Sequence, residues 1–332
     1  MRSLSASVLV VVVSVICGAC SSSSSAPTSP SAPGVPPGAQ GCARTSVGFS
    51  PLSDQGFRPY EDQSGGLYPG GNSPPLLHLL AGINAASSIG PLAADGTPDS
   101  SGRYGFVSIG MSNTTQEFQA FLPMANADPS RDPSLVLVDG AQGGQTAADW
   151  GNPGCPCWIT LNARIQQAGL SARQVVVAWI KLANRQPTGP WPFATQQLKK
   201  DIATVVRELK ARFPNLVVGY LSSRIYAGYA TTTLNPEPYA YESGFAVRWV
   251  IEDQLNGLLP FQGPSAVAPW LAWGPYLWAD GLTARSDGLT WACGDLADDG
   301  THPSASGRQQ VADLLLDFVR TDPTAREWFV RP

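Results

Sequence analysis

The stretch Phe106-Val-Ser-Ile-Gly-Met-Ser-Asn-Thr-Thr115 decides how the chain is organised. Its apolar first half predicts a buried strand, and Gly110 permits a tight turn at the strand's end. Apolar residues then recur at helical spacing, which predicts a helix over 115–127. Ser112 therefore stands at the mouth of a helix, where free backbone N–H groups favour negative charge. A nucleophilic serine needs this environment, although a serine at a helix start is also a common cap.

A second stretch, Asp298-Asp-Gly-Thr-His-Pro-Ser304, precedes an amphipathic helix near the C-terminus. His302 in this stretch is one of only two histidines; the other, His78, stands among leucines and is expected to be structural. A serine hydroxyl needs a base to attack an ester at neutral pH, and histidine is the usual base. Asp299 lies three residues before His302, so one short turn can hold its carboxylate against the imidazole. The structural alternative is a turn followed by a helix start, but together with Ser112 the stretch favours catalysis.

From Tyr104 onward, apolar strands alternate with amphipathic helices. Strands are expected at 104–109, 134–139, 174–181, 215–221 and 268–273. Helices are expected at 115–127, 158–168, 193–212, 240–257 and 304–319. This alternation predicts a parallel sheet covered on both faces, a three-layer α/β/α domain of the flavodoxin-like kind. Ligands bind beyond the carboxyl ends of the strands in such sheets, so residues that follow the strands should converge at one edge.

These patterns resemble the SGNH/GDSL hydrolase family over roughly residues 104–319. That family has a nucleophilic serine after the first strand, an oxyanion glycine after the second, an oxyanion asparagine after the third, and a C-terminal Asp-x-x-His. The chain offers a match for each in order: Ser112, Gly144, Asn184, and Asp299 with His302. The resemblance implies a serine esterase whose oxyanion hole is formed by Ser112, Gly144 and Asn184. It implies no metal and no cofactor.

Three residues depart from the family pattern. Met111 stands where the family usually has aspartate, Ala183 replaces the glycine before the asparagine, and Arg185 replaces the aspartate after it. None of them is a proposed catalytic residue.

The N-terminus has the features of an export signal. Arg2 precedes an apolar run of about ten residues, half of what spans a bilayer, so residues 1–19 are expected to be a signal peptide. Gly18-Ala19-Cys20 resembles the lipobox of bacterial lipoproteins, although Cys17 stands where leucine is usual. This implies lipidation of Cys20 and a membrane anchor; ordinary secretory cleavage is the alternative. Residues 20–41 are rich in Ser and Pro and are expected to form a disordered tether.

Residues 42–332 are expected to form one hydrolase domain, in which the role of 42–102 is left open. A hydrophobic content of 43% is ample for a core. The formal net charge of −4 and the lack of a basic cluster argue against nucleic acid as a partner.

Four cysteines would remain after export to an oxidising compartment: Cys42, Cys155, Cys157 and Cys293. They allow three pairings. Cys155 and Cys157 are too close in sequence to favour pairing with each other, so a bridge from Cys293 to one of them is expected to stiffen the site. A zinc site is not favoured, because no histidine is suitably spaced and His302 already has a role.

The substrate is the least constrained feature. Arg224, Tyr226 and Tyr229 follow the fourth predicted strand and are interpreted as substrate-binding residues. Polar loops with interleaved tyrosines suit a hydroxyl-rich leaving group, so the predicted activity is hydrolysis of short acyl esters, acetyl above all, on a small molecule or a polysaccharide. Two alternatives remain: an envelope lipoprotein that binds glycans without catalysis, and an O-acyltransferase that uses the same site.

Overall fold

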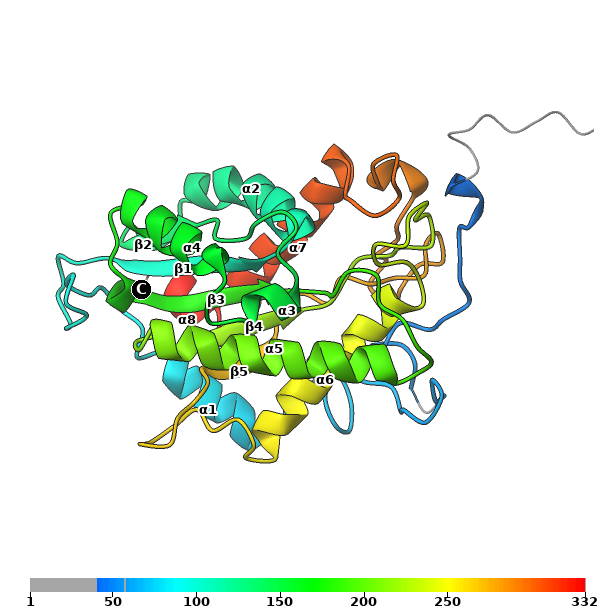
Figure 1. The fold of residues 1–332 in the computed structure, drawn as a ribbon. Helices are drawn as coiled ribbons and strands as arrows, with labels where there is room; N and C mark the ends of the chain where they lie inside the picture. Colours follow the sequence, from blue (N-terminus) through cyan, green and yellow to red (C-terminus); the bar gives the residue numbers. More distant parts are fainter. Residues whose placement is uncertain (1–40, 57, 332) are drawn as a thin grey trace, which may run out of the picture. The chain divides into compact units, whose positions relative to one another are not determined.

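The computed structural model describes residues 41–56 and 58–331, which are built around a five-stranded sheet (Figure 1). The strands are β1 (Tyr104–Gly110), β2 (Leu135–Val138), β3 (Val175–Lys181), β4 (Val218–Ser222) and β5 (Trp270–Trp273). Their order is β2-β1-β3-β4-β5, and each neighbouring pair is parallel. This is the flavodoxin-like order. The expected α/β fold class is therefore confirmed.

Helices cover the sheet on both faces. They are α1 (Leu76–Ala86), α2 (Ser112–Ala127), α3 (Ala147–Trp150), α4 (Pro156–Gln167), α5 (Phe193–Arg212), α6 (Tyr239–Leu255), α7 (Ala305–Thr321) and α8 (Arg326–Phe329). Helix α2 packs against α7, and α5 packs against α6. Figure 1 shows these two pairs on opposite sides of the sheet. Every residue of β1 and β3 is buried as a result, which explains their nearly continuous apolar sequences.

The expected helices are present, with small differences at their ends. Helix α5 has the expected bounds, whereas α2 begins at Ser112, three residues before the expected start. Among the helices after β1, α3 and α8 are additional, and each has only four residues, too few for a periodic pattern to reveal.

Helix α1 packs against β4 and β5. Within it, the imidazole of His78 stacks on Trp270, with 4.9 Å between the ring centroids. Its Nε2 lies 2.8 Å from the carbonyl oxygen of Leu271, and burial lowers the pKa of the imidazole. His78 therefore has the structural role that its leucine-rich surroundings predicted.

The disulfides correct the expected pairing. Cys293 pairs with Cys42, with 5.4 Å between the Cα atoms and 251 positions between them in sequence. Cys155 pairs with Cys157, with 5.2 Å between the Cα atoms. The expected bridge between Cys293 and the Cys155–Cys157 loop was wrong, because the N-terminal segment reaches the Cys293 loop. The Cys42–Cys293 bridge thus ties the start of the domain to the loop before Asp299.

The signal peptide, Cys20 and nearly all of the tether lie outside the described residues. In the part of the chain that is described, no helix is both long and apolar enough to cross a membrane.

Candidate active site

The turn between β1 and α2 fixes the position of Ser112. β1 ends at Gly110, Met111 is extended, and Ser112 is the first residue of α2. A Cβ atom on Gly110 would lie 2.2 Å from the side chain of Thr114 and 2.5 Å from the carbonyl oxygen of Lys181, so only glycine fits there. The half-buried Ser112 is thereby held at the carboxyl edge of the sheet, at a helix start whose N–H groups favour negative charge.

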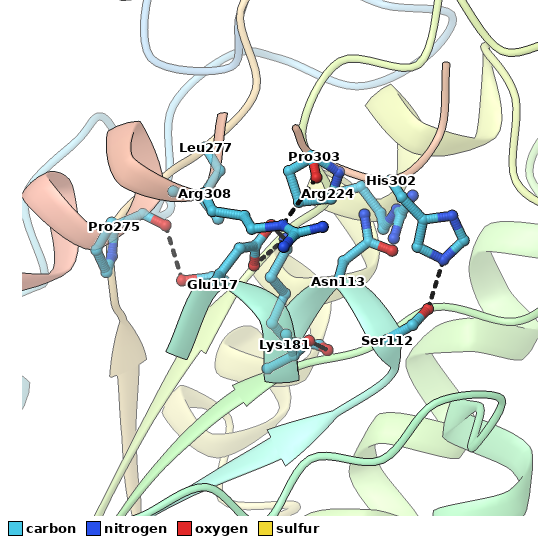
Figure 2. Close-up of polar contacts among 12 residues, drawn as sticks. Ser112, Asn113, Glu117, Lys181, Arg224, Pro275, Leu277, His302, Pro303 and Arg308 are labelled. Carbon is cyan, nitrogen blue, oxygen red and sulfur yellow. Dashed lines mark hydrogen bonds and ion pairs between the residues drawn. The ribbon is translucent and has the colours of Figure 1, made fainter. Parts of the chain in front are cut away.

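The turn before α7 brings Asp299 and His302 to Ser112. The Oγ atom of Ser112 lies 2.7 Å from Nε2 of His302, as Figure 2 shows. On the other side of the imidazole, Nδ1 lies 2.5 Å from Oδ2 of Asp299. With the proton on Nδ1, Nε2 is free to accept the hydroxyl proton of Ser112. The three side chains form a hydrogen-bonded chain in the order of a Ser-His-Asp triad.

Backbone contacts hold the shape of this turn. Gly300 has a positive φ of 61°, and a Cβ atom there would lie 1.9 Å from the carbonyl oxygen of Tyr229. The backbone N–H of Thr231 donates to the carbonyl oxygen of Asp299 over 3.0 Å. The loop after β4 therefore supports the turn that carries His302.

The carboxylate of Asp299 is stabilised in its charged form. Its Oδ1 accepts the backbone N–H groups of Thr301, at 3.0 Å, and of His302, at 2.9 Å. Burial opposes ionisation, but these N–H groups and the imidazole outweigh it and lower the pKa of the Asp299 carboxyl. Asp299 is thus suited to hold one tautomer of His302 and to balance the charge of an imidazolium.

The glycine loop after β2 lies beside Ser112. A Cβ atom on Gly143 would lie 3.9 Å from Cβ of Ser112, and Gly144 has a positive φ of 78°. The N–H of Gln142 donates to the carbonyl oxygen of Gly110 over 3.0 Å, which ties this loop to the serine turn. Gly143 and Gly144 are exposed, so their backbone is accessible to a substrate.

Asn184 follows β3 at the same edge, and its side chain is held from two sides. Its Oδ1 accepts the N–H of Ala148 at 3.1 Å, and its Nδ2 donates to Oδ2 of Asp201 at 2.6 Å. A side-chain amide has two N–H groups, and these contacts use only one of them. Arg185, one of the departures from the family pattern, makes an exposed ion pair with Asp149 at 3.5 Å.

The structure does not support the proposed substrate-binding residues. The side chains of Tyr226 and Tyr229 are buried, and their hydroxyls donate to the carbonyl oxygens of Arg44 and Trp291. Arg224 is also buried. All three residues follow β4 at the carboxyl edge, but the backbone carbonyls of Arg44 and Trp291 accept the tyrosine hydroxyls. With their side chains buried, these three residues are not available to bind a substrate at the surface.

A buried ion pair beside the serine turn was not anticipated from the sequence. The Nζ atom of Lys181, the last residue of β3, lies 2.5 Å from both carboxylate oxygens of Glu117 on α2. Neither side chain is more than 2% exposed, and Figure 2 shows the pair near Asn113. Burial raises the pKa of Glu117 and lowers the pKa of Lys181 to about 8. The only sequence signal was a lysine that ends an otherwise apolar strand.

A metal centre finds no support in the described residues. No group of three or more His, Cys, Asp or Glu side chains among them is arranged to hold an ion.

Comparisons with known proteins give weak similarities. No protein-family model matches the chain, and no curated protein matches it. Solved structures that match include a Bacillus subtilis protein (15% identity, TM-score 0.37, 66% of this chain and 56% of that one). A second is an acetyl-xylooligosaccharide esterase from Geobacillus (16% identity, TM-score 0.40, 69% of this chain and 97% of that one). A third is the periplasmic domain of a Salmonella Paratyphi A lipopolysaccharide acetyltransferase (14% identity, TM-score 0.36, 73% of this chain and 92% of that one). Similarity at this level does not transfer a function, which must come from the residues of the site.

Proposed function

We propose that the protein is a serine esterase that hydrolyses short acyl esters through an acyl-enzyme. The observation that carries this proposal is the hydrogen-bonded chain in which Ser112 Oγ contacts His302 Nε2 and His302 Nδ1 contacts Asp299. Such a chain converts a weakly nucleophilic hydroxyl into a nucleophile at neutral pH.

In the proposed reaction, Ser112 attacks the acyl carbonyl while His302 accepts the hydroxyl proton. The imidazolium, stabilised by Asp299, then gives this proton to the departing alkoxide, and the acyl group remains on Ser112. A water molecule, deprotonated by His302, attacks the acyl-enzyme and releases the carboxylic acid. The final proton transfer restores the hydroxyl of Ser112 and the neutral imidazole.

We assign the oxyanion hole to the backbone N–H groups of Ser112 and Gly144 and to the side chain of Asn184. The position of Ser112 at a helix start, the exposed glycine loop beside it and the free amide hydrogen of Asn184 support this assignment. Donors fixed before the reaction stabilise the oxyanion without reorganisation.

The loops at the carboxyl edge of the sheet favour a polar, hydroxyl-rich substrate. Exposed threonines at 231–233 lie next to the turn of His302, and their hydroxyls suit a carbohydrate leaving group. The proposed substrates are therefore acetylated or otherwise short-acylated carbohydrates.

A fluorophosphonate probe tests the nucleophile directly. The wild-type protein should be labelled, and Ser112→Ala should lose the label and several orders of magnitude in turnover. Ser101→Ala, at an exposed serine before β1, serves as the control and should behave as wild type. Full labelling of Ser112→Ala would refute the assignment.

The length of the acyl group tests the substrate class. We expect kcat/KM to fall from p-nitrophenyl acetate to the octanoate, and acetate to be released from an acetylated polysaccharide. A steady rise in kcat/KM toward long chains would instead favour a lipid substrate. An acyl-enzyme that is consumed faster by added sugar than by water, with acylated sugar as product, would identify an acyltransferase.

A glycan-binding lipoprotein without catalytic activity is the alternative of a different class. It predicts glycan binding with no labelling of Ser112. The proposed place of the protein is the cell envelope, with Cys20 lipidated and anchoring the domain to the membrane. Cys20→Ala should then release the mature protein from membranes, whereas an unacylated soluble wild type would indicate simple secretion.

A further inference from the structure

We propose that Asn113 and Arg224 are positioning residues that hold His302 against Ser112 through the backbone carbonyl of Thr301. The inference rests on the proposed function, because it concerns the same Ser112–His302 pair. Neither residue belongs to the Ser112–His302–Asp299 chain, and Arg224 is too deeply buried to meet a substrate.

Asn113 links α2 to the turn that carries His302. Its side chain is 2% exposed, and its Nδ2 donates to the carbonyl oxygen of Thr301 over 2.8 Å. Ser112 and Asn113 are consecutive, as are Thr301 and His302, so two adjacent residues of α2 bind two adjacent residues of the turn. The Asn113–Thr301 bond lies one residue away from the Ser112–His302 contact, both along α2 and along the turn. It therefore sets the distance between Ser112 and His302.

Arg224 reaches the same carbonyl from the end of β4. One of its guanidinium nitrogens lies 3.4 Å from the carbonyl oxygen of Thr301, and the side chain is 3% exposed. This contact is longer than that of Asn113, but the donor is charged, which strengthens it. The backbone N–H of Arg224 donates to Oγ of Ser243 on α6 at 3.0 Å, so the arginine is itself anchored.

The charges around Arg224 favour this role. Burial lowers the pKa of the guanidinium, while the carboxylates of Glu117, Glu237 and Asp299 oppose that effect. Lys181 is a nearby like charge, and its ion pair with Glu117 offsets it. The guanidinium thus lies in a field that includes the carboxylate of Asp299.

Displacement of the Thr301 carbonyl would move the imidazole, and a misplacement of about 1 Å can cost about 100-fold in rate. We therefore expect Asn113→Leu and Arg224→Met to lower kcat about 10- to 100-fold, with KM within about threefold. Both side chains act on one carbonyl, so the double variant should fall less than the product of the two effects. Arg224→Lys, which keeps the charge, should recover most of the lost kcat.

Nitrogen NMR of the histidine side chains gives a measurement that does not need activity. With only two histidines in the chain, ¹⁵N-histidine labelling yields two imidazoles, and His78 is the internal reference. In wild type, the His302 Nδ1 signal should report a protonated nitrogen bound to Asp299. In Asn113→Leu and Arg224→Met, the signals of His302 should shift or broaden toward mixed tautomers while those of His78 stay unchanged.

Asn215→Leu is the matched control. The amide of Asn215 also donates to backbone carbonyls, those of Gly96 at 3.0 Å and Arg173 at 2.8 Å, but at the amino edge of the sheet. It should affect stability without changing kcat or the His302 signals. If Asn113→Leu fails to fold, Asn113→Ser removes the amide with a polar residue in its place.

Unchanged kcat and unchanged His302 signals in folded variants of both residues would overturn the inference. Equal changes of kcat and of the His302 signals in Asn215→Leu would also overturn the inference, since they would show a general loss of stability. Failure of the proposed function is a separate outcome: wild type would not react with fluorophosphonate, whereas the NMR comparison would still report whether Asn113 and Arg224 position His302.

Discussion

The Oγ atom of Ser112 lies 2.7 Å from Nε2 of His302, although 190 positions separate the two residues in the sequence. One residue begins the helix after the first strand, and the other ends the turn before the last long helix. They meet because α2 packs against α7 on one side of the sheet. The contact therefore depends on the packing of the two helices.

The two histidines should respond very differently to substitution. His302→Ala should be nearly as inactive as Ser112→Ala, and the double variant little worse, because the two residues act as a unit. His78→Ala should keep its turnover number and lose roughly 1–3 kcal/mol of stability, because it removes a buried ring stacked on Trp270. Esterase kinetics and urea unfolding of the four variants check this. Activity that follows His78 and ignores His302 would overturn the assignment of the base.

Asn184→Ala should lower turnover about 100- to 1,000-fold, as expected for loss of one oxyanion donor. Its effect on KM should be far smaller, because the donor acts mainly in the transition state. Asp201→Ala removes the carboxylate that holds Nδ2 of Asn184, and it should also lower turnover, but by a smaller factor. Steady-state kinetics of both variants decide the matter; a change confined to KM would show that Asn184 only binds substrate.

Asp299 should make the stability of the protein depend on pH in the acid range. Its folded-state pKa is lowered below the usual value of about 3.9, so its carboxylate stabilises the fold above about pH 4. That contribution is lost as the pH falls through the lower, folded-state pKa. Urea unfolding from pH 7 to pH 2 should show the advantage of wild type over Asp299→Asn shrinking below pH 4. A difference that stays constant over this range would contradict the prediction. Turnover of Asp299→Asn should fall about 10⁴-fold, because the imidazole is then held in the wrong tautomer.

Breaking the buried pair of Lys181 and Glu117 should destabilise the fold strongly, whereas replacing both residues with apolar ones should destabilise it little. Lys181→Met leaves an unpaired carboxyl in the core and should cost about 3–5 kcal/mol of the free energy of unfolding. Combining Lys181→Met with Glu117→Leu removes both charges and should restore most of this loss. Denaturant unfolding of the single and double variants measures the difference. Equal destabilisation in both would mean that the pair itself stabilises the fold.

The sequence by itself determined the order of strands and helices and the edge at which the candidate site lies. Continuous apolar segments predict strands buried on both faces, and parallel strands direct their carboxyl ends to one edge. Ser112 follows a strand at that edge, and Asp299 and His302 are three residues apart in a turn. The chain holds only one other histidine, so local spacing and elimination sufficed to select these three residues, whose catalytic roles remain a proposal.

Only the tertiary structure decided which side chains at that edge are accessible and which are buried. Arg224, Tyr226 and Tyr229 lie at the expected edge but are buried, and the tyrosine hydroxyls donate to the carbonyl oxygens of Arg44 and Trp291; no local pattern predicts these long-range contacts. The same holds for the Cys42–Cys293 bridge and for the bond from Asn113 to Thr301. The spacing of apolar residues in a segment shows which of its faces packs against the core. Contacts between segments hundreds of residues apart depend on how loops close over the sheet, and a single sequence does not encode this in any local repeat.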